Sequence, residues 1–243
     1  MNHFASHKNP LFFIAEIGGN HEGDFAYAEH LAQLAVESGA DAVKFQIYAG
    51  DTLVSRVEGP DRNVHFKRFE LTRQQYEHLA GICEKGGAKF MASVWDAERL
   101  AWADKFIPIH KVGSGDVTCF PLIKQLVATG KPLILSTGLC TLAEVLRTVE
   151  YVRALDQTMI TKRKLALLQC TTSYPCPDQD ANLKAITKLK ESFSLPTGYS
   201  NHTLGMDAIT AAATMGAEII EAHFTDSREG KTFRDHLVSV TRD

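Results

Sequence analysis

Short apolar segments alternate with amphipathic segments along almost the whole chain. Val, Ile, Leu, Phe and Ala concentrate in short runs, which is typical of parallel strands that are buried on both faces. The weakest run by residue propensity is the seventh. These runs predict eight β-strands, at residues 11–17, 41–46, 88–93, 107–112, 132–136, 164–169, 197–200 and 217–224.

Between the strands, apolar residues recur at spacings of three and four, which predicts amphipathic helices. Thr72 is the expected N-cap of one of them. The clearest helix follows Thr141, and its expected apolar face consists of Leu142, Val145, Leu146, Val149, Val152 and Leu155. The other predicted helices lie at residues 25–35, 72–83, 96–105, 120–128, 183–189 and 206–215. Residues 49–65 are expected to form a long polar loop, a kind of segment that is often functional.

This strict alternation over 243 residues predicts a parallel sheet of eight strand–helix units. Eight such units that close on themselves form a (β/α)8 TIM barrel, so we expect a single barrel domain over residues 1–243. The alternative is an open, doubly wound sheet. A GxGxxG motif after the first strand would favour that alternative, and the sequence has none there.

The pattern ends one helix short of a complete barrel. Residues 225–243 follow the last strand and have no helical periodicity. We therefore expect the eighth helix to be absent. The seam between the first and last strands would then be covered by another subunit or left as an apolar groove.

Composition excludes several classes of protein. The net charge is −3 with acids and bases mixed, so neither a nucleic-acid nor a membrane-surface partner is expected. No apolar run approaches the roughly 18 residues of a membrane span. The start, Met1–Pro10, lacks the apolar core of a signal peptide, and the five cysteines include no CxxC pair. These features predict a cytoplasmic protein with reduced thiols.

Two histidines end neighbouring predicted strands. His202 and His223 are separated by the predicted helix at 206–215, so one strand–helix–strand unit brings them side by side. Two imidazoles in this arrangement can share a divalent metal and leave coordination positions open for a substrate. The alternative is that they are two unrelated loop histidines.

Polar residues also end the other strands. Residues two apart on a strand face the same way, which pairs Lys44 with Gln46, Ser200 with His202, and Glu221 with His223. In a barrel the loops after the strands form the active site. The same rim is expected to hold Glu16, Ser93, Lys111, Ser114, Ser136 and Tyr174.

Two lysines lie inside otherwise apolar strands. A buried ammonium without a partner is costly, so Lys44 and Lys111 require anions. Either they pair with Glu16, Glu221 or Asp116, or they bind an anionic ligand. Glu16 could act as an acid/base or bind a sugar hydroxyl. Together with a metal that polarises a carbonyl, these residues predict metal-assisted chemistry on a small anionic substrate.

At these residues the chain resembles the sialic acid synthase family, which includes N-acetylneuraminate, legionaminate and pseudaminate synthases and spore-coat polysaccharide relatives. The matching segments occur in the family's order and cover almost the whole chain. They are Ile14–Gly23, Gly39–Gln46, Lys111–Asp116, Gly130–Gly138, Cys170–Pro175, Gly198–Gly205 and Glu221–Thr225.

The resemblance implies an enzyme that condenses phosphoenolpyruvate with an N-acylated aminosugar such as N-acetylmannosamine. The products would be a nine-carbon 2-keto sugar acid and phosphate. It implies that His202 and His223 hold a divalent ion, with Mn²⁺ expected and Mg²⁺ or Co²⁺ as alternatives. Glu16 joins the two histidines as the expected catalytic set.

The matching segments also imply the substrate-binding residues. Glu16 and Gln46 would face the sugar, together with Asn63 and Asp235, and Ser93 and Thr172 complete the expected substrate-binding set. Phosphoenolpyruvate would be held by Lys44, Lys111, Ser114, Ser136, Tyr174 and Ser200.

The chain departs from the family's pattern at several places, including Lys231–His236, which replaces a Pro-Gly-Pro-Asp-His segment. No part of residues 1–243 is expected to form the family's C-terminal antifreeze-like domain. A homo-oligomer, expected to be a dimer, and a separate antifreeze-like polypeptide are therefore the candidate partners. Two alternatives stay open. One is a catalytically reduced or split accessory barrel that binds sugar. The other is a related phosphoenolpyruvate synthase acting on a phosphosugar, which would need more basic residues at the rim.

Overall fold

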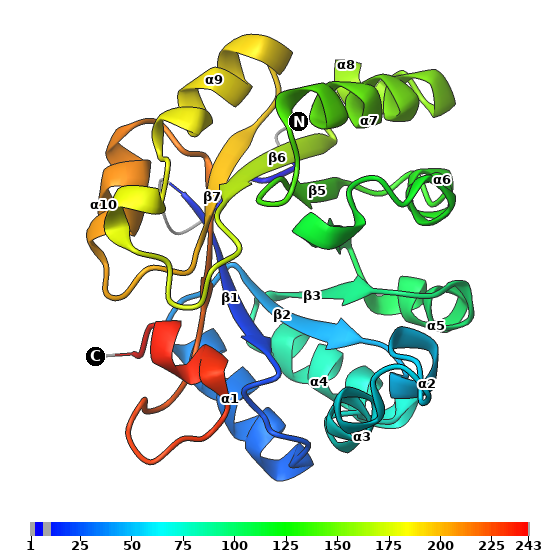
Figure 1. Ribbon diagram of the computed structural model, residues 1–243, viewed down its shortest axis with the longest axis vertical. Coiled ribbons are helices and arrows are strands. Elements are labelled where there is room, and N and C mark those ends of the chain that lie inside the picture. Colours follow the sequence, from blue (N-terminus) through cyan, green and yellow to red (C-terminus); the bar gives the residue numbers. More distant parts are fainter. Residues whose placement is uncertain (1–2, 7–10, 243) are drawn as a thin grey trace.

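Eight parallel strands close into a barrel in the computed structural model, which describes residues 3–6 and 11–242 (Figure 1). Neighbours in sequence are neighbours in the sheet, and β1 pairs with β8. The predicted (β/α)8 barrel is confirmed, and the open sheet is not. Part of the Met1–Pro10 start lies outside the described residues. The strands are β1 Phe12–Gly18, β2 Ala42–Ile47, β3 Lys89–Val94, β4 Ile109–Val112, β5 Leu133–Ser136, β6 Leu165–Cys170, β7 Thr197–Asn201 and β8 Ile219–His223.

The predicted helices are present, and capping residues define where several begin. Thr72 and Thr141 each form a capping box, in which the side chain at the third helical position bonds back to the cap. These helices are α1 Phe25–Glu37, α4 Arg73–Lys85, α5 Ala97–Ala103, α6 Phe120–Ala128, α7 Leu142–Leu155, α9 Lys184–Phe193 and α10 Asp207–Thr214. The buried face of α7 is narrower than predicted, because Leu142, Leu146 and Leu155 are exposed.

The structure corrects the prediction of a long loop at residues 49–65. This segment contains two helices, α2 Gly50–Leu53 and α3 Pro60–Arg68. Helix α3 begins with proline in its first turn, a position that requires no backbone donor. Most of its side chains are polar, so it has no apolar periodicity to detect. The chain also forms α8 Thr158–Thr161 and four 3-10 helices, η1 Asp104–Phe106, η2 Ser114–Asp116, η3 Asp178–Asp180 and η4 Arg234–Val238.

Two apolar layers surround the strands. Outward-facing strand residues pack against the helices in one large cluster, which includes Val43, Leu79 and Leu135. Inward-facing residues fill the lower part of the barrel: Phe4, Phe12, Ile14, Ala42, Met91, Ile109, Ile134, Ala166, Leu168 and Ile219. The barrel is therefore a packed core and not a pore, as in other TIM barrels.

No α-helix follows β8 in the described residues up to 242, as predicted. This stretch contains only η4 and a parallel bridge between Phe224 and Val240. A groove of about 300 Å³ lies beside β1, α1 and the end of β8, lined mainly by apolar residues that include Phe13 and Phe224. It matches the apolar groove expected at the seam. Nowhere among the described residues is a helix both long and apolar enough to span a membrane.

Candidate active site

The candidate active site is a cavity of about 850 Å³ at the carboxyl ends of the strands. Side chains two positions beyond the interior apolar layer face the barrel axis one layer higher. In that layer all eight strands contribute a polar or thiol group: Glu16, Lys44, Ser93, Lys111, Ser136, Cys170, Ser200 and Glu221. The next layer toward the mouth includes Gln46, Thr172, His202 and His223. The two-residue period of the strands therefore places the site directly on top of the packed core.

The two buried lysines share two carboxylates at the floor of the cavity. Lys44 Nζ lies 2.7 Å from Glu16 Oε2 and 3.6 Å from Glu221 Oε2. Lys111 Nζ lies 3.5 Å from Glu221 Oε1 and donates to Ser136 Oγ at 2.8 Å. The sequence left open whether the lysines pair with carboxylates or bind an anionic ligand, and the structure shows that they pair with Glu16 and Glu221. Both lysines also line the cavity, so a bound anion could still reach them.

Burial and the neighbouring lysines shift the pKa values of the two carboxyl groups, Glu16 and Glu221, in opposite directions. Burial alone would raise the pKa of Glu221, but Lys111 and Lys44 outweigh it and lower this pKa to about 2. Ser200 Oγ also donates to Glu221 at 2.8 Å. Burial raises the pKa of Glu16, and this effect exceeds the attraction of Lys44. Glu221 is therefore the fixed negative charge, and Glu16 is the carboxyl group better suited to exchange a proton.

His202 and His223 lie next to each other, with ring centroids 5.5 Å apart. His202 Nδ1 donates to Thr171 O at 2.8 Å, which leaves Nε2 of this ring as the acceptor. His223 Nδ1 is buried and has no hydrogen-bond partner among the described residues. The closest carboxylate oxygen, Asp235 Oδ2, is 3.9 Å away. The two rings therefore offer nitrogen lone pairs to the same region of the cavity.

Both imidazoles are neutral at pH 7. Burial lowers the pKa of His202 to about 4 and that of His223 to about 3. Neutral imidazole is the form that ligates metals. An unsatisfied buried nitrogen beside a second neutral ring fits a divalent ion. No third His, Cys, Asp or Glu completes a ligand group within the part of the chain described here, so solvent or substrate would fill the other positions.

Tyr174 covers this histidine pair from the β6 loop. Its ring centroid lies 3.9 Å from that of His202. The Arg234 guanidinium lies 4.5 Å from the Tyr174 ring centroid, and Arg234 Nε donates to Asp235 Oδ1 at 3.0 Å. Tyr174 therefore contacts both the histidine pair and a cation from the C-terminal segment.

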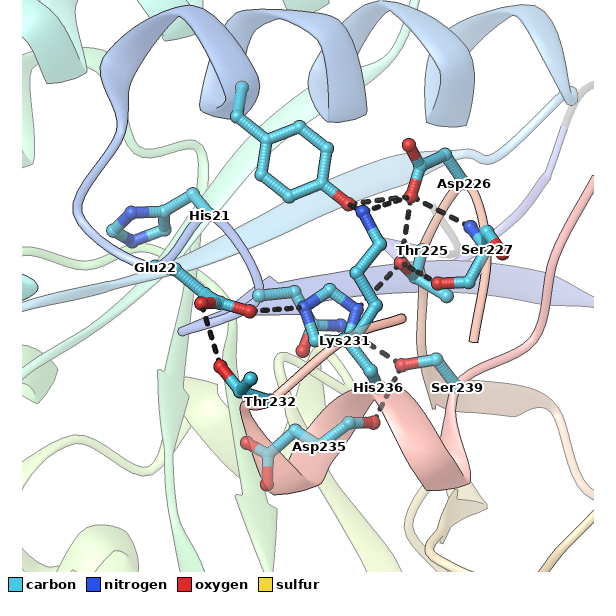
Figure 2. Close-up of polar contacts among 12 residues, drawn as sticks. His21, Glu22, Thr225, Asp226, Ser227, Lys231, Thr232, Asp235, His236 and Ser239 are labelled. Carbon is cyan, nitrogen blue, oxygen red and sulfur yellow. Dashed lines mark hydrogen bonds and ion pairs between the residues drawn. The ribbon is translucent and has the colours of Figure 1, made fainter. Parts of the chain in front are cut away.

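The C-terminal segment, residues 225–240, brings Asp235 into the site. Figure 2 shows how it is fastened: His236 lies between Thr225 and Glu22, with Nδ1 2.8 Å from Thr225 Oγ1 and Nε2 3.3 Å from Glu22 Oε1. Thr232 Oγ1 donates to Glu22 at 3.2 Å. Further polar contacts join Tyr27 and Lys231 to Asp226, and Asn20 to Ser239. The segment is thus held to the loop after β1 and to the first turn of α1 by contacts between distant parts of the sequence.

All but one of the predicted site residues line this cavity. They are Glu16, Lys44, Gln46, Ser93, Lys111, Ser114, Ser136, Thr172, Tyr174, Ser200, His202, His223 and Asp235. Asn63 is the exception. Its amide donates to Gly50 O at 3.1 Å and to Val54 O at 2.8 Å, so it holds α2 against α3. The expectation that Asn63 faces the substrate is corrected, because these backbone carbonyls occupy its amide.

Several lining residues were not predicted from the sequence. Glu221 was expected at the rim but not as the hub of the lysine network. The mouth is formed largely by α3 and the residue after it, and by the C-terminal segment. Pro60 after Gly59 was the available signal for α3. The lining residues that local sequence patterns do not reveal include Arg62, His65, Phe66, Arg68, Phe69, Phe233 and Arg234.

Comparison with known proteins gives relatives over nearly the whole chain. The N,N'-diacetyllegionaminic acid synthase of Legionella pneumophila is 37% identical, over 94% of this chain and 67% of that protein. The N-acetylneuraminate-9-phosphate synthase of Mus musculus is 31% identical, over 96% of this chain and 67% of that protein. The chain thus spans about two thirds of the length of these curated relatives.

A solved structure and a family model agree with these relatives. The crystal structure of N-acetylneuraminic acid synthetase from Leptospira borgpetersenii serovar Hardjo-bovis, in complex with citrate, is similar with a TM-score of 0.89. It is 31% identical, and the match covers 96% of this chain and 79% of that chain. The NeuB family model matches residues 31–243. From this match and these relatives, the chain belongs to the NeuB family.

Proposed function

We propose that this protein condenses phosphoenolpyruvate with the aldehyde form of an N-acylated aminosugar. C3 of phosphoenolpyruvate forms a bond to the aldehyde carbon, water adds to C2, and the bond between C2 and the phosphate oxygen breaks. The products are a nine-carbon 2-keto sugar acid and inorganic phosphate. The relatives named as synthases of legionaminic acid and N-acetylneuraminate 9-phosphate support this class of reaction.

One observation carries the proposal: two neutral imidazoles and two buried ammonium groups face the same cavity. The rings of His202 and His223 lie 5.5 Å apart, and Lys44 and Lys111 line the cavity floor below them. This arrangement suits two substrates at once. The ammonium groups attract an anion, and the imidazole pair could hold a divalent ion that polarises the carbonyl of the second substrate. A cavity of about 850 Å³ has room for both.

Phosphoenolpyruvate would bind through the lysines and the nearby hydroxyls. Lys111 Nζ and Ser136 Oγ are 2.8 Å apart, so both can donate to one oxygen of an anion that lies beside them. Ser114 lies at the same side, where its Oγ accepts from Gly138 N at 2.9 Å. The excess charge of the anion would be balanced by Lys111; within the described chain Glu221, at 3.5 Å, is the one carboxylate within ion-pair distance of it.

Glu16 would bind and orient the aminosugar. Its Oε1 accepts from Gln46 Nε2 at 3.3 Å, so carboxyl and amide together present both kinds of hydrogen-bonding group to sugar hydroxyls. Because burial raises the pKa of Glu16, this carboxyl can also supply the proton that the aldehyde oxygen needs as the new bond forms.

Mn²⁺ is the proposed cofactor, with Mg²⁺ or Co²⁺ as alternatives, and when bound it would act as a Lewis acid toward the sugar carbonyl. His202 and His223 are the residues that would hold it. Thr171 O fixes the His202 ring through Nδ1 at 2.8 Å, which aims Nε2 into the cavity.

The test is release of phosphate from phosphoenolpyruvate with manganese and a panel of N-acylated aminosugars. His202→Ala and His223→Ala should each abolish this release and weaken manganese binding measured by calorimetry. The exposed histidine His78 on α4 provides the matched control, and His78→Ala should leave both unchanged.

Circular dichroism of each variant would establish that the barrel is folded. The proposal fails if folded, manganese-loaded protein releases no phosphate with any aminosugar. Unchanged manganese affinity in both site variants would leave the reaction standing but remove the metal assignment.

A further inference from the structure

Asn20 is a buried amide at the point where three parts of the chain meet. It lies in the loop after β1 and has no exposed surface. Its Nδ2 donates two hydrogen bonds, to Phe224 O at 2.8 Å and to Ser239 Oγ at 2.9 Å. Phe224 directly follows the end of β8, and Ser239 lies in the C-terminal segment. Both N–H bonds of one amide are therefore used by segments 204 and 219 positions away.

The loop that carries Asn20 is itself fixed on β1. Asn20 N donates to Ile17 O at 2.8 Å, which closes a turn over two glycines. Gly18 has a φ of 54°, in the left-handed region that favours glycine. A Cβ added at Gly19 would lie 2.8 Å from the Phe233 ring, so glycine lets the C-terminal segment pack directly on this turn. The amide is thus presented from a fixed base.

The first hydrogen bond of the Asn20 amide acts on the end of β8. Phe224 N donates to Glu16 O at 2.9 Å, and Phe224 O accepts from Asn20. The residue before it is His223, whose carbonyl oxygen accepts from Val240 N at 2.7 Å. The backbone around His223 is therefore held from both sides, and with it the direction in which the imidazole enters the cavity.

The second hydrogen bond reaches Asp235 through a serine. Ser239 Oγ accepts from Asn20 and donates to Asp235 O at 2.7 Å, the second of these bonds being drawn in Figure 2. All three residues are buried, with at most 5% of their surface exposed. An unmade hydrogen bond in such a place is costly, so the relay holds the backbone of Asp235 firmly.

Asp235 needs this support because its carboxylate faces the site. Its Oδ1 accepts from Arg234 Nε at 3.0 Å, whereas Oδ2 lies 3.9 Å from His223 Nδ1. Oδ2 is thus the oxygen placed beside the imidazole pair, where it could accept from a hydroxyl of the aminosugar. The two groups come from different segments, and Asn20 is bonded to both segments.

We infer that Asn20 is a positioning residue for the proposed reaction, on which this inference rests. One of its N–H bonds sets the direction of His223, and the other, through Ser239, sets the place of Asp235. Asn20 is not among the residues that line the cavity, so it acts only through these two. A catalytic geometry assembled from separate segments depends on such supports.

The two N–H bonds can be separated by mutation. Ser239→Ala breaks the relay to Asp235 and leaves the bond to Phe224 O in place. It should raise the KM of the aminosugar with the fastest phosphate release by about fivefold or more, with manganese affinity and the KM of phosphoenolpyruvate unchanged. Asn20→Leu, similar in size but without a donor, should raise the same KM and also weaken manganese binding by about tenfold or more.

Two controls separate positioning from stability. Ser239→Thr keeps the hydroxyl and should retain most of the aminosugar affinity. Thr148→Val removes another buried hydroxyl bond, from Oγ1 to Val117 O at 3.0 Å, outside the cavity lining. It should lower the free energy of unfolding and leave both KM values unchanged. An unchanged aminosugar KM in Ser239→Ala, or an equal rise in Thr148→Val, would overturn the inference.

A crystal structure of each variant gives a readout that needs neither turnover nor metal. Ser239→Ala should displace Asp235 and leave His223 in place, whereas Asn20→Leu should displace both. If Asn20→Leu does not fold, Ser239→Ala alone decides. Displacement of Asp235 in a protein whose unmodified form consumes no aminosugar would leave the positioning role standing while the proposed function fails. An unmoved Asp235 in Ser239→Ala would show that the relay is wrong, whatever the reaction.

Discussion

Single residues in this site are defined by how their charge is compensated. Lys111 is buried and has one carboxylate neighbour, Glu221, at 3.5 Å, whereas Lys44 has two. Burial lowers the pKa of Lys111, while two carboxylates overcome burial and raise that of Lys44. Lys111 is thus the lysine whose charge is less completely balanced, and the one that gains more from a bound anion.

Replacing Lys111 by Met should weaken phosphoenolpyruvate binding by roughly 10- to 150-fold. This range corresponds to the loss of a charge-assisted hydrogen bond, which contributes about 1.5–3 kcal/mol. Fluorescence of Trp95, which lines the cavity, can report the titration. The variant Lys124→Met on the exposed face of α6 is the matched control. Equal affinity in Lys111→Met and the control would contradict the role assigned to Lys111.

Among the elements, β7 shows why a weak strand prediction can still be correct. Residues Thr197–Asn201 have little β propensity, but both neighbours pair with them in register. A Cβ added at Gly198 would lie 2.1 Å from Ile219 O and 2.7 Å from Leu168 Cδ2. Glycine therefore allows β7 to approach β8 closely, and this approach carries Ser200 and His202 to Glu221 and His223.

Gly198→Ala should destabilise the fold by about 1–3 kcal/mol or more, because the new methyl group meets backbone that cannot move without breaking the barrel register. Urea unfolding followed by circular dichroism measures this change. Gly81→Ala, in the interior of α4 with open space around it, is the matched control and should stabilise by about 0.5–1 kcal/mol. A stable Gly198→Ala variant would mean that the strands tolerate a wider spacing.

At the scale of the whole molecule, the barrel buries several histidines in the neutral form. Burial lowers the pKa of His21 and His202 to about 4 and that of His223 to about 3. In the unfolded chain each histidine takes up a proton near pH 6.5. The unfolded state therefore binds more protons than the folded state below about pH 6.5, so acid favours unfolding.

The free energy of unfolding should fall as pH decreases from about 6.5 to about 4, by up to about 1.4 kcal/mol per pH unit for each such histidine. Above pH 7 these histidines should contribute little to the pH dependence of the free energy of unfolding, because they are neutral in both the folded and the unfolded state. Urea midpoints measured between pH 8 and pH 4 test this. In His223→Gln the free energy of unfolding should depend less steeply on pH, by up to the contribution of one bound proton. The exposed control His78→Gln should not reduce this dependence. A midpoint independent of pH over this range would contradict burial of neutral imidazoles.

The two-residue period of the strands made much of the fold and the floor of the site predictable. Once the apolar strands were recognised, Glu16, Lys44, Lys111 and Ser200 were assigned to one face, because residue parity along a strand is a local property. The histidine pair was predictable for the same reason. The residues of the C-terminal segment were harder to assign, since Asp235 reaches the site only through contacts with the loop after β1.

What the sequence determined by itself was therefore the barrel, the polar layers above its core and the pair of imidazoles. Tertiary structure alone decided which lysine pairs with which carboxylate, that Asn63 holds two helices together, and that Arg62 and Arg234 meet at one mouth. The physical reason is the range of the interactions. Strand periodicity acts between residues two apart, whereas the mouth is assembled from segments about 170 positions apart, whose meeting no local pattern encodes.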